Sequence, residues 1–133
     1  MSVERAIHEL WGADFGLTSL VPADRVFTGS ACGAPDLPYV VLTRHESRPI
    51  ARTSSGRWLE ETAVRLAVWS AGLDEAKRIA AEIDRRFDRK SFEQAGVMCL
   101  NMRRTKDIAS LERGGAWRLS IEYIVLTENE RGA

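Results

Sequence analysis

The chain has 133 residues, a length at which one ordinary hydrophobic core can form a single domain. Apolar residues make up 44% of it and charged residues 29%, a composition that excludes disordered and fibrous proteins. Its 19 Lys and Arg residues balance its 19 Asp and Glu residues, so overall charge attracts neither nucleic acid nor an anionic membrane. The sequence shows no secretion signal and no long apolar run, which predicts a soluble protein, made in a cytoplasm, that does not bind a membrane.

The first part of the chain predicts one short helix, a further helical turn or two, and a weak strand. Apolar residues recur at helical spacing across residues 3–11, with Ser2 placed to cap the start of the helix and Gly12 its end. A further turn or two of helix is expected within residues 14–21, before a proline that stops it. Residues 25–29 could then form a short strand.

Two β-forming segments follow, and a long polar stretch separates them. Residues 39–43 are mostly aromatic or β-branched, and residues 62–69 alternate between two faces in the manner of a strand. Residues 46–60 are mostly polar, so they are predicted to form a long protruding loop. A connection of that length is commonly functional or disordered.

The second half of the chain predicts the main helix and a final hairpin. Apolar residues recur at helical spacing across residues 72–87, opposite a charged face. Residues 97–106 and 116–127 predict two strands, joined through a Gly-Gly pair at 114–115 that tolerates the positive φ angles of a tight turn. Residues 88–96 have no clear assignment.

In chain order these elements predict an α+β fold, built as one domain over residues 1–133. Neighbouring strands follow one another closely enough to pair mostly as antiparallel hairpins. We therefore expect a four- or five-stranded, mainly antiparallel sheet with two helices packed on one face.

The sequence offers few groups suited to catalysis or to metal binding. His8 and His45 are its two histidines, and neither lies in a metalloprotease, nucleophile-elbow, phosphate-loop or dinucleotide-binding motif. Cys32 and Cys99 are far apart and form no CxxC pair or Cys/His cluster, so both are expected to be ordinary buried or half-buried thiols. The sequence therefore predicts no enzyme activity, no catalytic residue, no cofactor and no metal site.

Positive charge gathers around the predicted loop, where Glu46 is the only acidic residue before Glu60. A cationic protrusion of this kind suits the DNA backbone or an acidic protein neighbour, and the sequence leaves both open. Residues 53–57 could bind an anion through their backbone amides, although a solvated loop is the simpler interpretation. The candidate binding residues are Arg44, Arg48, Arg52, Arg57 and Trp58.

The four tryptophans divide between the core and possible contact surfaces. Trp11 and Trp117 fit core positions by their spacing. Trp69 lies across its strand from Val68, and we expect the main helix to cover it. Trp58 lies in the predicted loop, where it is either exposed, as at an interface, or folded back onto the sheet.

Two strands and the helix after them carry a family resemblance. The first strand is Leu37-Pro38-Tyr39-Val40-Val41-Leu42, and the second, residues 61–70, ends in Val-Trp-Ser and leads directly into the Ala- and Glu-rich helix of residues 72–87. In this order, after a short amino-terminal helix and around a polar loop, they resemble the tail completion, or tail-to-head joining, proteins of long-tailed bacteriophages. That group is related in fold to tail terminators. The resemblance covers residues 3–127.

The resemblance implies a structural protein without enzymatic activity. Its subunits would associate, typically as hexameric rings, on the finished tail tube, stop its growth and give the head a docking surface. The implied partners are copies of the chain itself, the tail tube protein, a head-side connector protein and DNA that passes through the lumen without sequence-specific binding. The implied location is the virion, at the head-to-tail interface, after assembly in the host bacterial cytoplasm.

The resemblance also implies a location for the predicted loop, which would lie at the lumen of such a ring or at contacts between rings. Arg48, Arg52 and Arg57 are the residues best able to make those contacts. Ring closure needs an interface whose two patches differ, and unpaired sheet edges could supply them. The alternative function is a small nucleic-acid-binding module that uses the arginine-rich segment 44–57. In that case the isolated monomer would bind with an affinity that falls steeply as salt rises.

Overall fold

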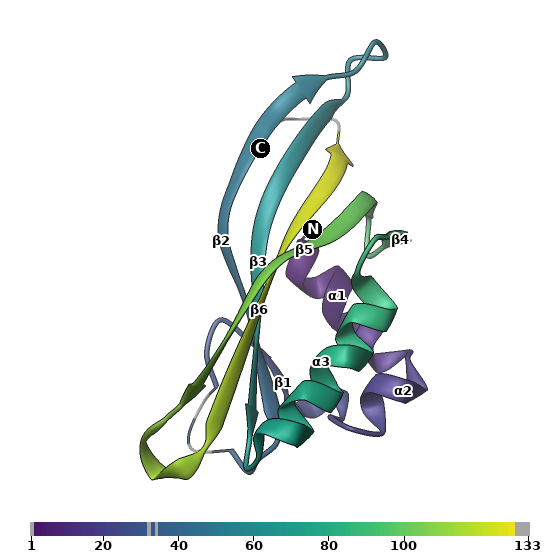
Figure 1. The fold of residues 1–133 in the computed structure, drawn as a ribbon. Coiled ribbons are helices and arrows are strands. Elements are labelled where there is room, and N and C mark those ends of the chain that lie inside the picture. Colours follow the sequence, from purple (N-terminus) through teal and green to yellow (C-terminus); the bar gives the residue numbers. More distant parts are fainter. Residues whose placement is uncertain (1, 32, 34, 130–133) are drawn as a thin grey trace.

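A computed structural model describes residues 2–31, 33 and 35–129. Over these residues the chain forms three α-helices, two short 3₁₀ turns and six strands (Figure 1). The helices are α1 (Val3–Gly12), α2 (Phe15–Thr18) and α3 (Leu73–Phe87), and the 3₁₀ turns are η1 (Ala23–Arg25) and η2 (Arg113–Gly115). The strands are β1 (Val26–Thr28), β2 (Tyr39–Arg52), β3 (Trp58–Ser70), β4 (Lys90–Gln94), β5 (Val97–Leu111) and β6 (Trp117–Asn129).

The strands form one curled sheet in the order β1-β2-β3-β6-β5-β4. β1 runs parallel to β2, and every other neighbouring pair is antiparallel. β3 and β6 lie at the centre and pair along their whole length, from Trp58 opposite Asn129 to Ser70 opposite Trp117. The helices lie on the concave side of the sheet, where α3 packs on β3 and β6, and α2 packs against α1 and α3 on the side away from the strands (Figure 1). The sheet therefore has a helix-covered concave face and a convex face without helices.

The expected four- or five-stranded, mainly antiparallel sheet with two packed helices is wrong, because the sheet is six-stranded and mixed and α2 is a third helix. β4 lies in the unassigned segment 88–96, a mostly polar stretch without apolar alternation. A tight turn joins β4 to β5, and in it Ala95 and Gly96 have φ angles of 51° and 78°. β1 is only three residues long and reaches β2 across residues 29–38, so no local pattern reveals their parallel pairing.

The predicted loop at residues 46–60 is mostly strand. β2 continues to Arg52 and β3 begins at Trp58, so the loop proper is the turn at residues 53–57. β2 is exposed from Arg44 onward, and a strand that is solvated on both faces needs no apolar alternation. Its polar composition therefore predicts a loop although it pairs with β3. We call this extension of the hairpin beyond the helices, residues 44–60, the β2–β3 arm (Figure 1).

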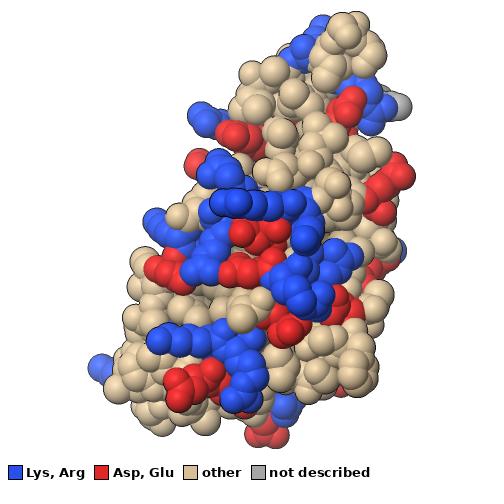
Figure 2. Space-filling view, turned by 45° about the vertical axis from the view of Figure 1, so that its right-hand side comes forward, with Lys and Arg blue, Asp and Glu red and all other residues tan. Residues whose placement is uncertain are grey.

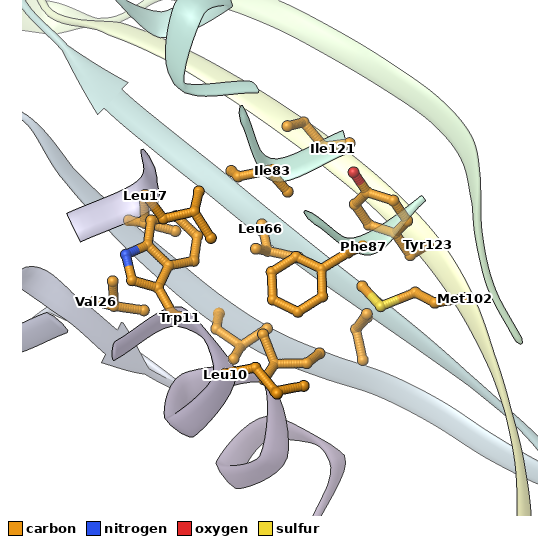
Figure 3. Packing of buried hydrophobic residues seen from close by; sticks show 14 of the residues in the cluster. Leu10, Trp11, Leu17, Val26, Leu66, Ile83, Phe87, Met102, Ile121 and Tyr123 are labelled. Atoms are coloured by element: carbon orange, nitrogen blue, oxygen red, sulfur yellow. The ribbon is translucent and has the colours of Figure 1, made fainter. Parts of the chain in front are cut away.

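The core lies between the concave face of the sheet and helices α1 and α3 (Figure 3). Trp11 of α1 is fully buried, and its Nε1 donates a 2.8 Å hydrogen bond to the carbonyl of Val21. Phe87 of α3 is fully buried as well. Burying such a side chain stabilises the fold by roughly 1.5–3 kcal/mol. Trp117, which was also predicted in the core, is only half-buried at the start of β6.

Side-chain contacts cap α1 and α2 and join α2 to α3. Ser2 caps α1 as predicted, since its hydroxyl accepts the backbone N–H of Arg5 at 3.1 Å. Asp14 caps α2 in the same way and also accepts ion pairs from Arg85 and Arg86 in the last turn of α3, at 2.7 and 3.6 Å. One carboxylate thus ties α2 to the end of α3, where cations are favoured by the helix dipole.

Candidate functional site

The β2–β3 arm carries the candidate binding residues, and its arginines have partners within the molecule. Three ion pairs join the arm to α1, β3 and β6, at N–O distances of 3.8, 3.2 and 3.0 Å respectively. Because the arginines are largely exposed, each pair contributes at most about 1 kcal/mol, but it reduces the charge that the arginine offers to another molecule. The pairs are Arg44–Glu4, Arg48–Glu61 and Arg57–Glu128.

Arg52 and Trp58 form a cross-strand pair near the end of the arm. They are opposite each other in the register, and the guanidinium carbon of Arg52 lies 5.5 Å from the ring centroid of Trp58, within cation–π range. Trp58 is half-buried, between the two outcomes that the sequence left open. At the usual rise of a strand, Arg44 and Arg52 lie roughly 26 Å apart along β2, so the arginines do not converge on one site.

The turn at residues 53–57 uses its backbone amides internally. The N–H of Thr53 donates to the carbonyl of Arg57 at 2.7 Å, and the N–H of Gly56 donates to the carbonyl of Thr53 at 3.0 Å. The N–H of Arg57 donates to the Thr53 hydroxyl at 3.1 Å. These three amides are therefore not available to an anion.

A hollow of about 770 Å³ lies beside the arm on the concave side of the sheet. It is bounded by the arm, the start of α1 and the β4–β5 turn. Glu60 of β3 lines it and is only 8% exposed, and Thr62 and Thr127 beside it are exposed by 1% and 5%. Glu93 of β4 lies on its rim and is exposed. A carboxylate, two hydroxyls and an apolar margin thus lie together where the helices no longer cover the sheet.

Sequence reasoning missed Glu60, although a signal for it was present. Glu60 and Thr62 continue the alternation of Val64, Leu66 and Val68, the residues of β3 that face the core. A carboxylate at a position that the period-two pattern assigns to the core is a buried charge, and such a group needs a partner. Period-two spacing alone could therefore have marked Glu60 as unusual.

The convex face carries a row of aromatic side chains that no described helix covers. Tyr39 and Trp69 stack with their ring centroids 5.8 Å apart, and Phe27 of β1 meets Tyr39 edge-on at 6.0 Å. The guanidinium carbon of Arg118 lies 5.6 Å from the Trp69 ring centroid. The expectation that the main helix covers Trp69 is wrong, because Val68 occupies the core face of β3 and Trp69 the opposite face.

The sequence and the fold both have known counterparts. Residues 5–128 match the family described as tail completion protein gp17. The chain belongs to this tail completion family. A chain in the virion of a native gene transfer agent particle has the same fold, with a TM-score of 0.77, 17% identity and 96% of each chain covered. A second solved chain, 17% identical over 94% of this chain and 96% of its own, has a TM-score of 0.48.

No curated protein matches the sequence. Membership of the tail completion family nevertheless confirms the predicted resemblance and identifies a tail-related structural protein of a phage-like virion. In such a protein the surfaces that contact other subunits are the functional sites. The hairpins that extend beyond the core, the hollow and the convex aromatic row are the features to consider.

Each histidine of this tail completion chain lies beside a backbone carbonyl or a hydroxyl. His8 Nε2 lies 2.9 Å from the carbonyl of Ala23, and His45 is exposed, 3.5 Å from the hydroxyl of Thr43. Cys99 is buried as predicted, and burial raises its pKa to about 11, whereas Cys32 lies outside the described residues. Over residues 2–31, 33 and 35–129, no group of three His, Cys, Asp or Glu side chains is placed to hold a metal ion.

None of the helices described is long and apolar enough to cross a membrane.

Positive and negative charge are interleaved on the face shown in Figure 2. Blue side chains gather across the middle of this face, and red side chains lie among them and beside them. Ion pairs such as those of Arg104 with Asp84 and Asp107 join opposite charges within the molecule. A surface of alternating charge does not attract a long stretch of DNA backbone.

Proposed function

We propose that this chain is the ring-forming subunit at the head-to-tail joint of a phage-like particle. In this role six copies cap the finished tail tube, end its growth and present the surface to which the head docks. The match of residues 5–128 to the tail completion family carries the proposal. The occurrence of a chain of this fold in the virion of a gene transfer agent particle supports it. The role requires contact surfaces and no catalytic step.

Ring closure requires two different patches on each subunit, because identical subunits then meet head to tail. Two free strand edges are suited to this. β1 pairs with residues 40–42 of β2, and β4 pairs with residues 97–102 of β5. Residues 43–52 of β2 and 103–111 of β5 are therefore left without a further strand partner among the described residues. Exposed edges of this kind pair readily with another chain. They lie on opposite edges and toward opposite ends of the sheet (Figure 1).

The β2–β3 arm is proposed to reach the lumen of the ring or the adjoining ring, with Arg48, Arg52 and Arg57 as its contact residues. Each of these arginines already interacts with a side chain of its own molecule, so the positive charge that it presents is modest. Modest attraction suits a lumen through which DNA must slide without sticking. The proposed partners are copies of this chain, the tail tube protein, a head-side connector protein and the passing DNA, all at the head-to-tail interface of the virion.

Sedimentation velocity over a wide range of concentrations, with electron microscopy of the largest species, tests this proposal. We expect closed rings of six subunits, either free at high concentration or bound to isolated tail tubes. A chain that stays monomeric at every concentration and does not bind tail tubes would contradict it. Arg48→Glu, compared with Arg78→Glu on the exposed face of α3, then tests the arm, and we expect only the first to weaken docking.

A further inference from the structure

The free stretch of β5 ends in an unprotected strand edge. Proteins normally guard free edges with proline, bulges or charge, because an exposed edge pairs with other chains. The free stretch of β2 has such guards, since it contains Pro49 and two shifts in its register with β3. Residues 106–111 of β5 contain no proline and pair with β6 without a shift, and Ile108 and Leu111 among them are 59% and 61% exposed. A regular edge with two uncovered apolar side chains is suited to pair with another chain.

The outer edge of β1 lies on the opposite side of the sheet. The N–H of Gly29, directly after β1, donates to the carbonyl of Leu42 in β2 at 2.9 Å. Successive residues of a strand direct their backbone groups to opposite sides, so Val26 and Thr28 direct theirs away from β2. The N–H of Val26 donates to Ala23, which leaves its carbonyl and both groups of Thr28 without a strand partner among the described residues.

The same alternation gives the free backbone groups of β5. The N–H of Glu112 donates to the carbonyl of Ala116 at 2.8 Å, on the side toward β6. Counting back along the regular segment, Asp107, Ala109 and Leu111 direct their N–H and C=O groups away from β6. Ile108, between the first two, directs its groups toward β6.

The two edges match in position and in direction. One row of register partners crosses the convex face from β1 to β5, and its members are Phe27, Val41, Ala67, Ser120 and Ile108. β1 runs parallel to β2, and three antiparallel pairings then follow, so β5 runs opposite to β1. Two copies placed side by side with the same end up therefore bring β1 of one beside β5 of the other as antiparallel strands, without a large shift along them.

Charge favours β1 over the free stretch of β2 as the partner of β5. Like charges opposite each other destabilise a strand pair. The basic residues of the two free stretches are Arg44, Arg48 and Arg52 on β2 and Arg103, Arg104 and Lys106 on β5. Residues 26–30 carry no charge. β1 also lies at the end of the sheet away from the β2–β3 arm, so its pairing leaves the arm free for the lumen or the adjoining ring (Figure 1).

We infer that β5 of each copy pairs with β1 of the next as antiparallel strands, with Ile108 opposite Phe27, so that the sheets join edge to edge around the ring. This inference rests on the proposed ring and names the strands that close it. In this register the outward backbone groups meet, and the pairs that they form are Thr28 with Asp107 and Val26 with Ala109. Ile108 packs on Phe27 on the convex face, which extends the aromatic row across the contact. Since the two edges differ, the contact is head to tail.

Disulfide trapping tests the register. Phe27→Cys and Ile108→Cys are combined in a Cys32→Ser background, in which the remaining native thiol is the buried Cys99. Opposite residues that are not hydrogen-bonded to each other have the closest side chains, within reach of a disulfide. We expect oxidation of the rings, free or on tail tubes, to give a covalent ladder that ends at six subunits. Phe27→Cys with Ser110→Cys, two residues further along the same face, should give at least about 10-fold less product.

A charge at the edge tests the same contact without a cross-link. Ile108→Lys places an ammonium group opposite Phe27, and we expect it to raise the dissociation constant between copies about 10-fold or more, measured by sedimentation equilibrium. Phe15→Lys, at an apolar residue of α2 that is 84% exposed, should leave that constant unchanged. Circular dichroism and thermal unfolding establish that each variant is folded.

The outcomes distinguish this inference from the proposed function. If the wild-type protein forms rings but the Phe27–Ile108 pair does not cross-link, or Ile108→Lys assembles equally well, the pairing is wrong although the ring remains. If Ile108→Cys alone gives dimers in the same yield, β5 pairs with its own copy and the inference is overturned. It is also overturned if Arg48→Cys with Ile108→Cys cross-links instead, because β2 is then the partner. If the wild-type protein forms no ring, alone or on tail tubes, the proposed function fails and the pairing with it.

Discussion

Tyr123 of β6 is a fully buried residue whose hydroxyl lies at the partly exposed edge of the core, beside α3 and β5 (Figure 3). The hydroxyl donates to Asp84, and Arg104 pairs with the same carboxylate. The backbone N–H of Arg104 also donates to Asp88 at 2.9 Å, just after α3 ends. Burial, followed by the hydrogen bond to Asp84, raises the pKa of Tyr123 above its usual value of 10.0. The cluster ties the end of α3 to the strands beneath it while Tyr123 stays protonated.

The raised pKa of Tyr123 predicts a loss of stability in alkali. Above pH 10 the unfolded chain loses the phenolic proton while the folded chain retains it, so rising pH favours the unfolded state. We expect the free energy of unfolding to fall more steeply above pH 10 in the wild-type protein than in Tyr123→Phe. At pH 7 the substitution should cost about 1–3 kcal/mol, because the partly buried carboxylate of Asp84 loses a donor. Urea unfolding from pH 7 to pH 11.5 measures both effects.

Tyr39→Phe is the matched control for this experiment. Tyr39 lies on the convex face, where its hydroxyl bonds to none of the described side chains, and we expect a change below about 0.5 kcal/mol at pH 7. Identical alkaline slopes for the wild-type protein and Tyr123→Phe would contradict the role assigned to the buried phenol.

Cys99 should be almost unreactive in the folded protein. Burial raises its pKa from the usual 9.0 to about 11, and the thiolate is the reactive form. Two pKa units correspond to about 100-fold less thiolate near neutral pH, so we expect iodoacetamide to label the native protein at least about 100-fold more slowly than the urea-unfolded protein. Cys32→Ser provides a chain in which Cys99 is the one remaining thiol. Similar labelling rates in the native and unfolded states would show that Cys99 is accessible.

At the scale of elements, the sequence predicts best those that bury one face. The stripe that ends at Phe87 in α3 and the alternation through Tyr123 in β6 both record contact with the core, and both elements lie where they were expected. The strands of the β2–β3 arm and β4 could not be predicted from apolar periodicity, because both segments are largely solvated. Their strand character comes from pairing with neighbours in the sheet, which a local pattern does not record.

In the candidate site, too, the sequence reveals residues that are close together along the chain but not the contacts that only folding brings about. The arginines of the arm are evident from the sequence, but the acids that pair with them are not. Glu4 and Glu128 lie far from the arm along the chain, and only the folded arrangement brings them to Arg44 and Arg57. Glu60 was overlooked because acidic residues are normally exposed, so composition suggests a loop position for it.

The attachment of α3 to the sheet depends on its last buried residue. Phe87 is fully buried, so Phe87→Ala removes a large apolar contact and leaves a cavity. We expect a loss of about 3–5 kcal/mol in the free energy of unfolding, measured by urea titration with circular dichroism. Arg78→Ala, on the exposed face of the same helix, should change it by less than about 0.5 kcal/mol. Equal losses in the two variants would mean that α3 is not anchored through this face.

The whole molecule combines zero formal net charge with a sheet that extends well beyond its helix-covered core (Figure 1). Neutrality removes long-range attraction to DNA, while the extended hairpins provide contact surfaces at both ends. This combination favours a subunit that binds its own kind and lets DNA pass. To act as a nucleic-acid-binding module, the chain would have to break the interactions of the arm arginines with their internal partners, so that these arginines could bind phosphates.

The salt dependence of DNA binding separates these two functions. If Arg44, Arg48, Arg52 and Arg57 all bound phosphates, the logarithm of the binding constant would fall with the logarithm of salt concentration at a slope of about −3.6. Because each arginine interacts within its own molecule, we expect the isolated chain to bind duplex DNA weakly, with a slope shallower than about −1. Fluorescence anisotropy with labelled DNA between 50 and 200 mM salt measures the slope, and Arg48→Gln should leave it unchanged. A slope near −3.6 that decreases by about 0.9 for each arginine replaced would instead favour the nucleic-acid-binding module.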